Sequence, residues 1–312
     1  MQSLGHPTTA KTEVDDDMAV LGFVGPGVMG RPMAANLVAA GHEVRVYGRS
    51  PESRARAGTT GGTIVESVRE VPAGAEVVFT MLPDGPAVLD AIAGEDGILA
   101  AMTPGAVLVD HSTISPAEAA QVHAAAERAG VRCLDAPVSG GEAGAIEGAL
   151  SIMVGGDRDV LDAVRPLLAV MGGTVVHVGA AGAGQVVKAA NQLMVAGHIQ
   201  MLAEALVFLR AHGADLPAAL DVLGGGLAGS TVLQRKRAAM LGGDFAPGFR
   251  IALHDKDLGI VSGAVREHGL ALPATALMAS LVAAVDARGG GGLDHSALYG
   301  LALELNGMKT TD

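Results

Sequence analysis

The stretch that most constrains the fold is AVLGFVGPGVMG at residues 19–30, a short apolar run followed at once by closely spaced glycines. A short apolar run that ends at glycine, as Ala19–Val24 does, is typical of a strand buried inside a parallel sheet. Apolar residues then recur at helical spacing over Val28–Ala40, and Gly41 stands where a helix commonly ends. The segment Glu43–Tyr47 (EVRVY) has the pattern of a second strand. This start predicts a βαβ unit with a glycine-rich first turn.

The alternation of strands and helices continues to about residue 178. Further strands are expected at Glu76–Leu82, Ala106–Asp110, Val131–Asp135, Leu150–Val154 and Thr174–Val178, with helices at Pro116–Ala129 and Val160–Met171. Such an alternation predicts an α/β fold with a Rossmann-type, doubly wound and mostly parallel sheet. From about Gly184 to Ala211 the period is that of one long helix, and beyond it the chain has the pattern of helices with glycine or proline joints.

The turn after the first strand contains the pattern G-x-G-x-x-G from Gly25 to Gly30. Its glycines permit a tight turn and a close approach of backbone to a pyrophosphate, while the helix start supplies N–H groups and positive potential. We therefore expect a dinucleotide to be bound by Gly25, Gly27, Val28, Met29 and Gly30. The alternative is a glycine turn that binds nothing.

The end of the second strand bears on the choice of nucleotide. NAD enzymes usually have an acidic residue there for the ribose hydroxyls, whereas Tyr47 is followed by Gly48, Arg49 and Ser50. Arg49 could bind a 2′-phosphate through charge-assisted hydrogen bonds. The sequence therefore favours NADP, with NAD possible, over an interpretation of Arg49 as an ordinary surface arginine.

Two further strand ends are expected at the same edge of the sheet, because open α/β sheets bind ligands at the carboxyl ends of their strands. They contain Leu82 and Pro83 at the end of one strand and Thr113 after the next. Each could instead be an ordinary loop.

The pattern of strands and helices along the chain predicts four segments: a flexible acidic tail (1–17), a dinucleotide-binding domain (18–181), an interdomain helix (182–211) and an all-helical C-terminal domain (212–312).

The composition limits the possible partners. The formal net charge of −12 argues against nucleic acid or an anionic membrane. Cys133 is the only cysteine, which excludes a disulfide framework and a zinc cluster and fits the cytoplasm, and the acidic start of the chain is unlike a secretory signal. No metal site is expected. The long helix is apolar nearly all round, so a homo-oligomer, dimer or tetramer, is expected to cover part of it.

A serine and two glycines follow the strand Val131–Asp135, in the segment DAPVSGG. The hydroxyl of Ser139 and the unhindered amides of Gly140 and Gly141 form a nest suited to a carboxylate, although a flexible glycine loop has the same composition. A phosphorylated sugar acid is disfavoured, because the loop from Ser139 to Gly156 contains no arginine or lysine.

The only formal charge between Val178 and Ala203 is Lys188, near the start of the long helix. Lys188, Asn191 and Gln192 share one helix face. Hydride transfer to an aldehyde generates an alkoxide, which a neighbouring ammonium can protonate, and apolar surroundings would lower the pKa of that amine toward neutrality. Asn191 could hold the substrate oxygen. The alternative is a lysine that extends its head to solvent.

Taken together these motifs resemble the β-hydroxyacid dehydrogenase family from about Leu21 to Asn306. The matching segments are GFVGPGVMGRPMAANL, TMLP, DHSTISP, DAPVSGGEAGAIEGALSIMVGG, GAGQVVKAANQ and FRIALHDKDL. The resemblance implies a catalytic acid/base and a substrate-fixing residue (Lys188, Asn191), a carboxylate site (Ser139, Gly140, Gly141) and cofactor contacts (Leu82, Pro83, Thr113, Lys256). For Lys256 a surface ion pair is the alternative, because Asp255 and Asp257 flank it.

The resemblance also implies the reaction, which is NAD(P)H-dependent reduction of a small 3-oxo acid. Four segments are more similar to family members that reduce tartronate semialdehyde to D-glycerate: KAANQ, GGLAGSTVL, FAPGFRIALHDKDL and DHSAL. The alternatives are oxidation of 3-hydroxyisobutyrate or a related β-hydroxy acid, imine reduction, which usually lacks this lysine, and nucleotide binding without catalysis. Gly48 departs from the acid of NAD-preferring members, so cofactor choice does not follow from the resemblance.

Overall fold

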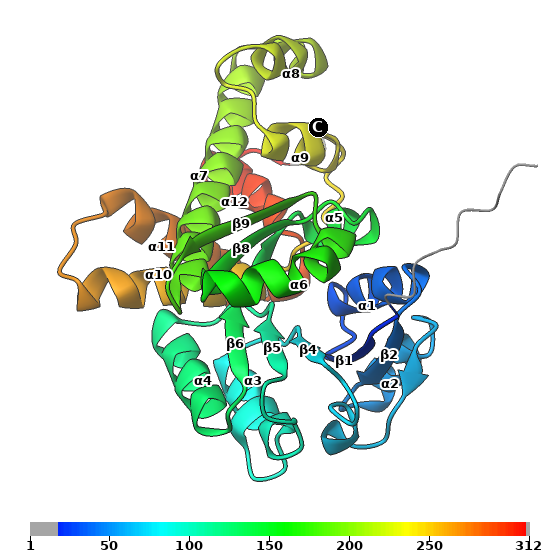
Figure 1. The fold of residues 1–312 in the computed structure, drawn as a ribbon. Helices are drawn as coiled ribbons and strands as arrows, with labels where there is room; N and C mark the ends of the chain where they lie inside the picture. The colour runs from blue at the N-terminus through cyan, green and yellow to red at the C-terminus, as the bar shows by residue number, and fades with distance from the viewer. Residues whose placement is uncertain (1–17, 310–312) are drawn as a thin grey trace, which may run out of the picture.

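The computed structural model describes residues 18–309, so the expected acidic tail lies outside the described residues (Figure 1). Within that part, the first half of the chain forms one sheet. Its strands are β1 (Val20–Val24), β2 (Glu43–Tyr47), β3 (Thr63–Ile64), β4 (Val77–Thr80), β5 (Val107–Asp110), β6 (Arg132–Asp135), β7 (Val138–Ser139), β8 (Ser151–Gly156) and β9 (Thr174–Gly179).

The strand order is β3-β2-β1-β4-β5-β6-β8-β7, and β9 pairs with β8. The pairs from β3 to β6 are parallel, β8 is antiparallel to both β6 and β7, and β9 is parallel to β8. The predicted doubly wound, mostly parallel sheet is therefore confirmed. The order reverses at β1, between β2 and β4, and such a switch point is where open α/β sheets bind ligands.

Helices cover both faces of the sheet: α1 (Gly30–Ala39), α2 (Pro51–Ala57), α3 (Gly85–Ala93), α4 (Pro116–Arg128), α5 (Gly141–Ile146) and α6 (Arg158–Met171). Side chains alternate along each strand, so in β4 Phe79 joins the core under α1 and α6 while Val78 joins the core under α3 and α4. The helices α2, α3 and α5 were not among those expected, because each is too short for a clear 3.6-residue period.

Strand β8 is longer than predicted, because it continues through Gly155 and Gly156 rather than ending at Val154. These glycines pair with Asp135 and Leu134 of β6. A Cβ on Gly155 would lie 2.5 Å from a carboxylate oxygen of Asp135, so only glycine permits this close approach.

The second half of the chain is helical: α7 (Ala183–Ala211), α8 (Leu216–Gly225), α9 (Thr231–Gly242), α10 (Ile251–Glu267), α11 (Pro273–Ala287) and α12 (Leu298–Leu305). Single 3-10 turns are formed by Val68–Glu70, Ile98–Ala100, Gly290–Gly292 and His295–Ala297. The long helix α7 starts against β8 and β9 and rises away from the sheet among α8, α9, α10 and α12 (Figure 1). By length and apolarity alone α7 could cross a membrane, but Ile199, Leu202 and Leu206 belong to the core of this helical half.

Candidate active site

The glycine turn after β1 has the geometry that a pyrophosphate site requires. Gly25 has a φ of 95°, and a Cβ on it would lie 2.3 Å from the carbonyl oxygen of Met81. A Cβ on Gly30 would lie 2.1 Å from the carbonyl oxygen of Gly25. At Gly27, by contrast, no atom lies within 4 Å of where a Cβ would be. The first and third glycines are therefore required by packing, and the second leaves space for a phosphate to approach.

Of the remaining predicted residues of the turn, Val28 lies at its outer side, whereas Met29 is partly buried and packs against the core of the sheet. Val28 is 49% exposed, and Met29 directly precedes α1. A groove of about 380 Å³ begins here and is lined by Val28, Arg31, Ala55, Arg56, Thr59 and Glu142. The turn and this groove together favour the interpretation of an extended dinucleotide site over that of a glycine turn that binds nothing.

The end of β2 has no room for the acid of an NAD site. A Cβ on Gly48 would lie 2.5 Å from the hydroxyl of Ser53 and 2.7 Å from the carbonyl carbon of the same residue, so α2 excludes any side chain at position 48. Arg49 is exposed next to it. Arg54 donates a hydrogen bond of 3.0 Å to the carbonyl oxygen of Arg49 and so holds this loop.

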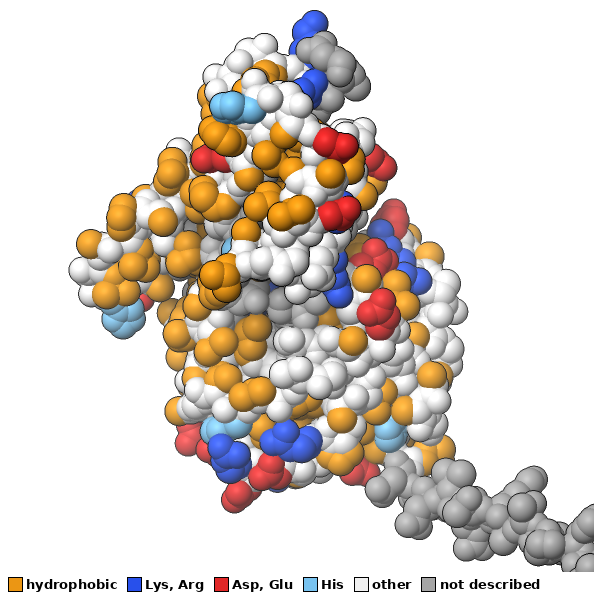
Figure 2. Space-filling model, turned by 90° about the horizontal axis from the view of Figure 1, so that it is seen from above, with side chains coloured by type: hydrophobic (Ala, Val, Ile, Leu, Met, Phe, Trp, Pro, Cys, Tyr) orange, Lys and Arg blue, Asp and Glu red, His pale blue; other side chains and the backbone are white. Residues whose placement is uncertain are grey.

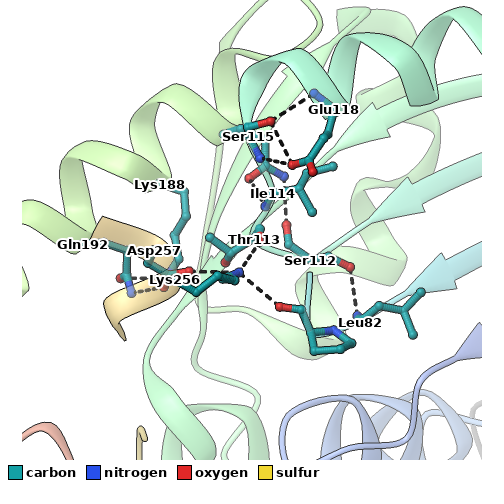
Figure 3. A network of polar contacts seen from close by, with 12 residues as sticks. Leu82, Ser112, Thr113, Ile114, Ser115, Glu118, Lys188, Gln192, Lys256 and Asp257 are labelled. Carbon is teal, nitrogen blue, oxygen red and sulfur yellow. Dashed lines mark hydrogen bonds and ion pairs between the residues drawn. The ribbon is translucent and has the colours of Figure 1, made fainter. Parts of the chain in front are cut away.

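The loops after β4 and β5 are fastened to each other. The hydroxyl of Ser112 accepts a hydrogen bond of 2.9 Å from the amide of Leu82, and the ammonium of Lys256 donates to the carbonyl oxygens of Pro83 and Thr113 (Figure 3). The structure thus brings together four of the five residues predicted outside the glycine turn as cofactor contacts, while the fifth, Arg49, lies at the end of β2. Lys256 comes from α10, which means that the helical half of the chain closes this edge of the sheet.

Lys256 also makes the ion pair that was its alternative interpretation. Its ammonium lies 3.0 Å from a carboxylate oxygen of Asp257, and its side chain is 26% exposed. Because the same ammonium binds both strand-end loops, Lys256 is more than a surface charge. A groove of about 500 Å³ runs past it between α4 and α10.

The start of α7 is capped by a residue that sequence reasoning missed. Asp135, at the end of β6, is buried and accepts hydrogen bonds from the amides of Gly182 (2.7 Å) and Gln185 (3.1 Å). A carboxylate at this end of a helix also interacts favourably with the helix dipole. A Cβ on Gly184 would lie 2.4 Å from the carbonyl oxygen of Met153, so glycine is needed for α7 to approach the sheet this closely.

A second missed residue fixes the rotation of α7. The buried amide of Gln185 accepts from the backbone of Ile114 (3.1 Å) and donates to the carbonyl oxygen of Ser112 (2.8 Å). Gln185 therefore ties the first turn of α7 to the loop after β5. Lys188, less than one turn further along, is positioned by these two anchors.

Lys188 does not extend to solvent. It is 6% exposed, and its ammonium donates a hydrogen bond of 2.9 Å to the side-chain oxygen of Gln192 (Figure 3). The pKa of Lys188 falls from 10.5 to about 8, mainly because the amine is buried. The negative charge of Asp257 raises this pKa, and the positive charge of Lys256 lowers it. An amine with this pKa can both give and take a proton near neutral pH.

Gln192, rather than Asn191, is the direct partner of Lys188. The side-chain oxygen of Gln192 accepts hydrogen bonds from the ammonium of Lys188 and from the side-chain NH₂ group of Asn191 (2.8 Å). The NH₂ group of Gln192 donates a hydrogen bond to the carboxylate of Asp257 (2.6 Å). The sequence did place Gln192 on the face of Lys188, but Asp257 lies 65 residues further along the chain. The role of Asn191 toward a substrate stays a prediction.

Two buried histidines lie behind Gln192. Because a carbonyl oxygen can only accept, Nε2 of His254 donates to the backbone oxygen of Gln192 (3.2 Å), and Nδ1 of His254 lies 3.3 Å from Nδ1 of His295. Burial lowers the pKa of both imidazoles, that of His295 to about 3. This neutral pair links α7, through His254 of α10, to the turn His295–Ala297.

The expected carboxylate loop lies where β7 ends, and α7 contacts β7. Gly140 and Gly141 have φ values of 141° and 66°, and no atom lies within 4 Å of a Cβ built on Gly141. The loop itself contains no cation, but α9 supplies one, because Arg235 donates a hydrogen bond of 2.7 Å to the carbonyl oxygen of Gly140. The loop from Ser139 to Gly156 indeed contains no arginine or lysine, and the cation beside it comes from a helix that is remote in sequence.

The site combines a glycine turn at the switch point of the sheet with a buried amine on the first turns of α7. The helical half of the chain closes over the neighbouring strand ends. This is the arrangement of a dehydrogenase that uses a nicotinamide nucleotide. Residues 20–179 match the family described as the NAD binding domain of 6-phosphogluconate dehydrogenase. Residues 182–302 match that described as NAD-binding of NADP-dependent 3-hydroxyisobutyrate dehydrogenase.

Individual proteins agree with these matches. The chain is 43% identical to 2-hydroxy-3-oxopropionate reductase of Escherichia coli K12, over 91% of this chain and 97% of that protein. It is 40% identical to a probable 3-hydroxyisobutyrate dehydrogenase of Mycobacterium tuberculosis H37Rv, over 82% and 88%. A structure of Mycobacterium tuberculosis 3-hydroxyisobutyrate dehydrogenase with L-serine is 38% identical, with a TM-score of 0.82 over 90% of this chain and 98% of the other.

A fourth comparison includes a bound cofactor. The protein Psf3, solved with NADP+ and 2-OPP, is 28% identical, with a TM-score of 0.83 over 90% of this chain and 99% of Psf3. The chain belongs to the β-hydroxyacid dehydrogenase family. It is an NAD(P)-dependent oxidoreductase that acts on CH–OH groups.

Proposed function

We propose that this enzyme reduces a small 3-oxo acid with NADPH, and that its preferred reaction converts tartronate semialdehyde to D-glycerate. The observation that carries the proposal is the buried ammonium of Lys188, with its pKa near 8, beside the loop after β5 that would bind the nucleotide (Figure 3). The 43% identity to a 2-hydroxy-3-oxopropionate reductase supports the choice of substrate.

In this mechanism the substrate carboxylate binds to the hydroxyl of Ser139 and the amides of Gly140 and Gly141. When bound, the nicotinamide ring supplies the hydride that forms the new C–H bond at the aldehyde carbon. The electrons of the C=O π bond move to oxygen, and Lys188 transfers a proton from its ammonium to that oxygen. Asn191 holds the substrate oxygen, while Gln192 and Asp257 keep the amine of Lys188 in position.

We further propose that the nucleotide is NADPH. A side chain at position 48 is sterically excluded, so no carboxylate from this position can bind the ribose hydroxyls. The guanidinium of Arg49 is exposed at the same strand end, where it would bind a 2′-phosphate. The pyrophosphate would lie on the glycine turn at Gly27.

Oxidation of 3-hydroxyisobutyrate is the second candidate, and the 40% identity to a probable 3-hydroxyisobutyrate dehydrogenase favours it. Imine reductases share the fold at 18% and 20% identity, with TM-scores of 0.52 and 0.60. The buried Lys188 argues against that activity and against a nucleotide-binding protein without catalysis.

Initial rates decide between these candidates. The purified enzyme is assayed with NADPH and with NADH against tartronate semialdehyde, methylmalonate semialdehyde, succinic semialdehyde and glyoxylate. We expect the highest kcat/KM for tartronate semialdehyde with NADPH. A higher kcat/KM for methylmalonate semialdehyde would favour the second candidate, and a clear preference for NADH would contradict the role of Arg49.

We also propose a cytoplasmic homo-oligomer, a dimer or tetramer. The half-buried thiol of Cys133 is the only one in the chain, which fits a reducing compartment. An exposed apolar stripe runs along α7 through Val186, Met194, Met201 and Phe208. The lobe of α10 and α11, on the left of Figure 1, has many hydrophobic side chains on the face that Figure 2 shows. Apolar surface of this extent indicates a partner, and a second copy is the partner that we propose.

A further inference from the structure

The carboxylate loop is fastened from the helical half of the chain by one arginine. Nη1 of Arg235, in the second turn of α9, donates a hydrogen bond of 2.7 Å to the carbonyl oxygen of Gly140. The same oxygen accepts a longer bond of 3.3 Å from the amide of Gly144, inside α5. Both glycines of the loop have positive φ, so side-chain packing contributes little to fixing their conformation.

The peptide unit between Gly140 and Gly141 converts this contact into an effect on the substrate site. Its bond is trans, so the carbonyl of Gly140 and the N–H of Gly141 lie in one plane and point in opposite directions. A guanidinium that fixes the carbonyl therefore fixes the direction of the N–H. The cation also polarises the peptide group, which makes the N–H a stronger donor.

We propose that Arg235 is a positioning residue for the substrate carboxylate, acting through the Gly140–Gly141 peptide. It aims the N–H of Gly141 away from α9, and no atom lies within 4 Å of a Cβ built on Gly141, so the residue itself does not crowd a ligand. This inference rests on the proposed function, in which that N–H binds the carboxylate. Arg235 itself need not touch the substrate.

The neighbouring cations of α9 are engaged elsewhere, which makes Arg235 distinct and supplies a control. Lys236 binds both carboxylate oxygens of Asp294, at 2.9 and 2.8 Å. Arg237 pairs with Asp221 of α8 at 2.7 Å. Arg237→Ala therefore removes a guanidinium from the same helix without touching the loop.

The test compares Arg235→Ala, Arg235→Lys and Arg237→Ala in the full-length enzyme. We expect Arg235→Ala to raise the KM for the acid substrate about tenfold, the effect of losing one charge-assisted hydrogen bond, with kcat and NADPH affinity within about twofold of wild type. Arg235→Lys should recover part of the loss, because an ammonium can still donate to the carbonyl. Arg237→Ala should leave all three quantities unchanged. An unchanged KM in Arg235→Ala, or an equal rise in Arg237→Ala, overturns the proposal.

Amide hydrogen exchange separates this proposal from the proposed function. In the protein without substrate, the amides of residues 141–146 should exchange faster in Arg235→Ala than in wild type or Arg237→Ala. Equal exchange rates overturn the positioning role. If the wild-type enzyme reduces none of the four oxo acids, the proposed function is wrong, and the exchange result still decides whether Arg235 holds the loop.

Discussion

At the scale of single residues, the unusual feature of this enzyme is a lysine kept inside the protein. Burial of an ammonium costs free energy unless the amine is neutral, and the fall in the pKa of Lys188 from 10.5 to about 8 corresponds to roughly 3 kcal/mol. This is a net figure, because the charge of Asp257 has already offset part of the cost of burial. We interpret the remaining cost as a loss of stability that is required for proton transfer.

Replacing Lys188 with methionine should therefore stabilise the fold while it removes activity. At pH 7 we expect the free energy of unfolding to rise by up to roughly 3 kcal/mol. Between about 8 and 10.5 the unfolded wild-type chain binds more protons than the folded one, so its stability rises with pH there and the difference from Lys188→Met shrinks. Urea unfolding of both proteins at pH 7 and pH 10 measures this. A variant less stable than wild type at pH 7 would contradict it.

Asp257 should set the pH at which reduction slows. Its charge raises the pKa of Lys188, so Asp257→Asn lowers that pKa and fewer molecules carry the ammonium at a given alkaline pH. We expect the alkaline limb of the pH–kcat/KM profile for reduction to move to lower pH. The asparagine oxygen can still accept from Gln192, which keeps the geometry.

Asp255→Asn is the matched control for that profile. Asp255 lies on the same helix but does not affect the pKa of Lys188, and the main cause of its own raised pKa is burial. The profile of this variant should coincide with that of wild type. Identical profiles for Asp257→Asn and wild type would show that the carboxylate does not act on Lys188.

At the scale of elements, the start of α7 determines where the amine of Lys188 lies. Asp135→Ala removes the acceptor of two backbone amides, Gly182 and Gln185, in a buried place. We expect a loss of about 2–4 kcal/mol in the free energy of unfolding, measured by chemical denaturation. The loosened helix start should also lower kcat.

A cap of the same residue type shows whether the loss comes from the hydrogen bonds. Asp157 precedes α6 but makes no side-chain cap hydrogen bond. Asp157→Ala should cost less than about 1 kcal/mol, the size of a helix-dipole effect. Similar losses in the two variants would mean that Asp135 does not anchor α7 as we describe.

Helix α7 shows which features of the site can be predicted from local sequence and which cannot. Helical periodicity predicted α7 to within a residue at its start and placed Lys188, Asn191 and Gln192 on one face. Spacing along one helix could not decide which amide contacts the amine, because side chains at i+3 and i+4 are both neighbours. That choice depends on Asp257 of α10, which draws Gln192 into the chain of hydrogen bonds.

At the scale of the whole molecule, the exposed stripe of α7 predicts an assembly. Met201→Asp should reduce the mass measured by light scattering after size exclusion, because a charge would be buried in the interface. Ile64→Asp, in the far strand β3, is the control, since Ile64 is also an exposed apolar residue. A wild-type monomer, or an unchanged mass in Met201→Asp, would contradict an interface at this stripe.

The whole molecule also explains which parts of the site the sequence could reveal. The doubly wound sheet and the glycine turn follow from local patterns of strand, turn and helix, and both are present as expected. The contacts of Arg235 with Gly140 and of Lys256 with Thr113 join residues more than 90 positions apart. Periodicity in the sequence cannot reveal such contacts, because they depend on how the helical half folds back over the edge of the sheet.

The most direct test of the account is turnover by Lys188→Ala. We expect kcat for the best of the four oxo acids to fall by about a thousandfold, as for loss of a general acid, while the Kd for NADPH and the circular dichroism spectrum stay those of wild type. Turnover within about tenfold of wild type, with NADPH bound normally, would contradict the assignment of Lys188 as the proton donor.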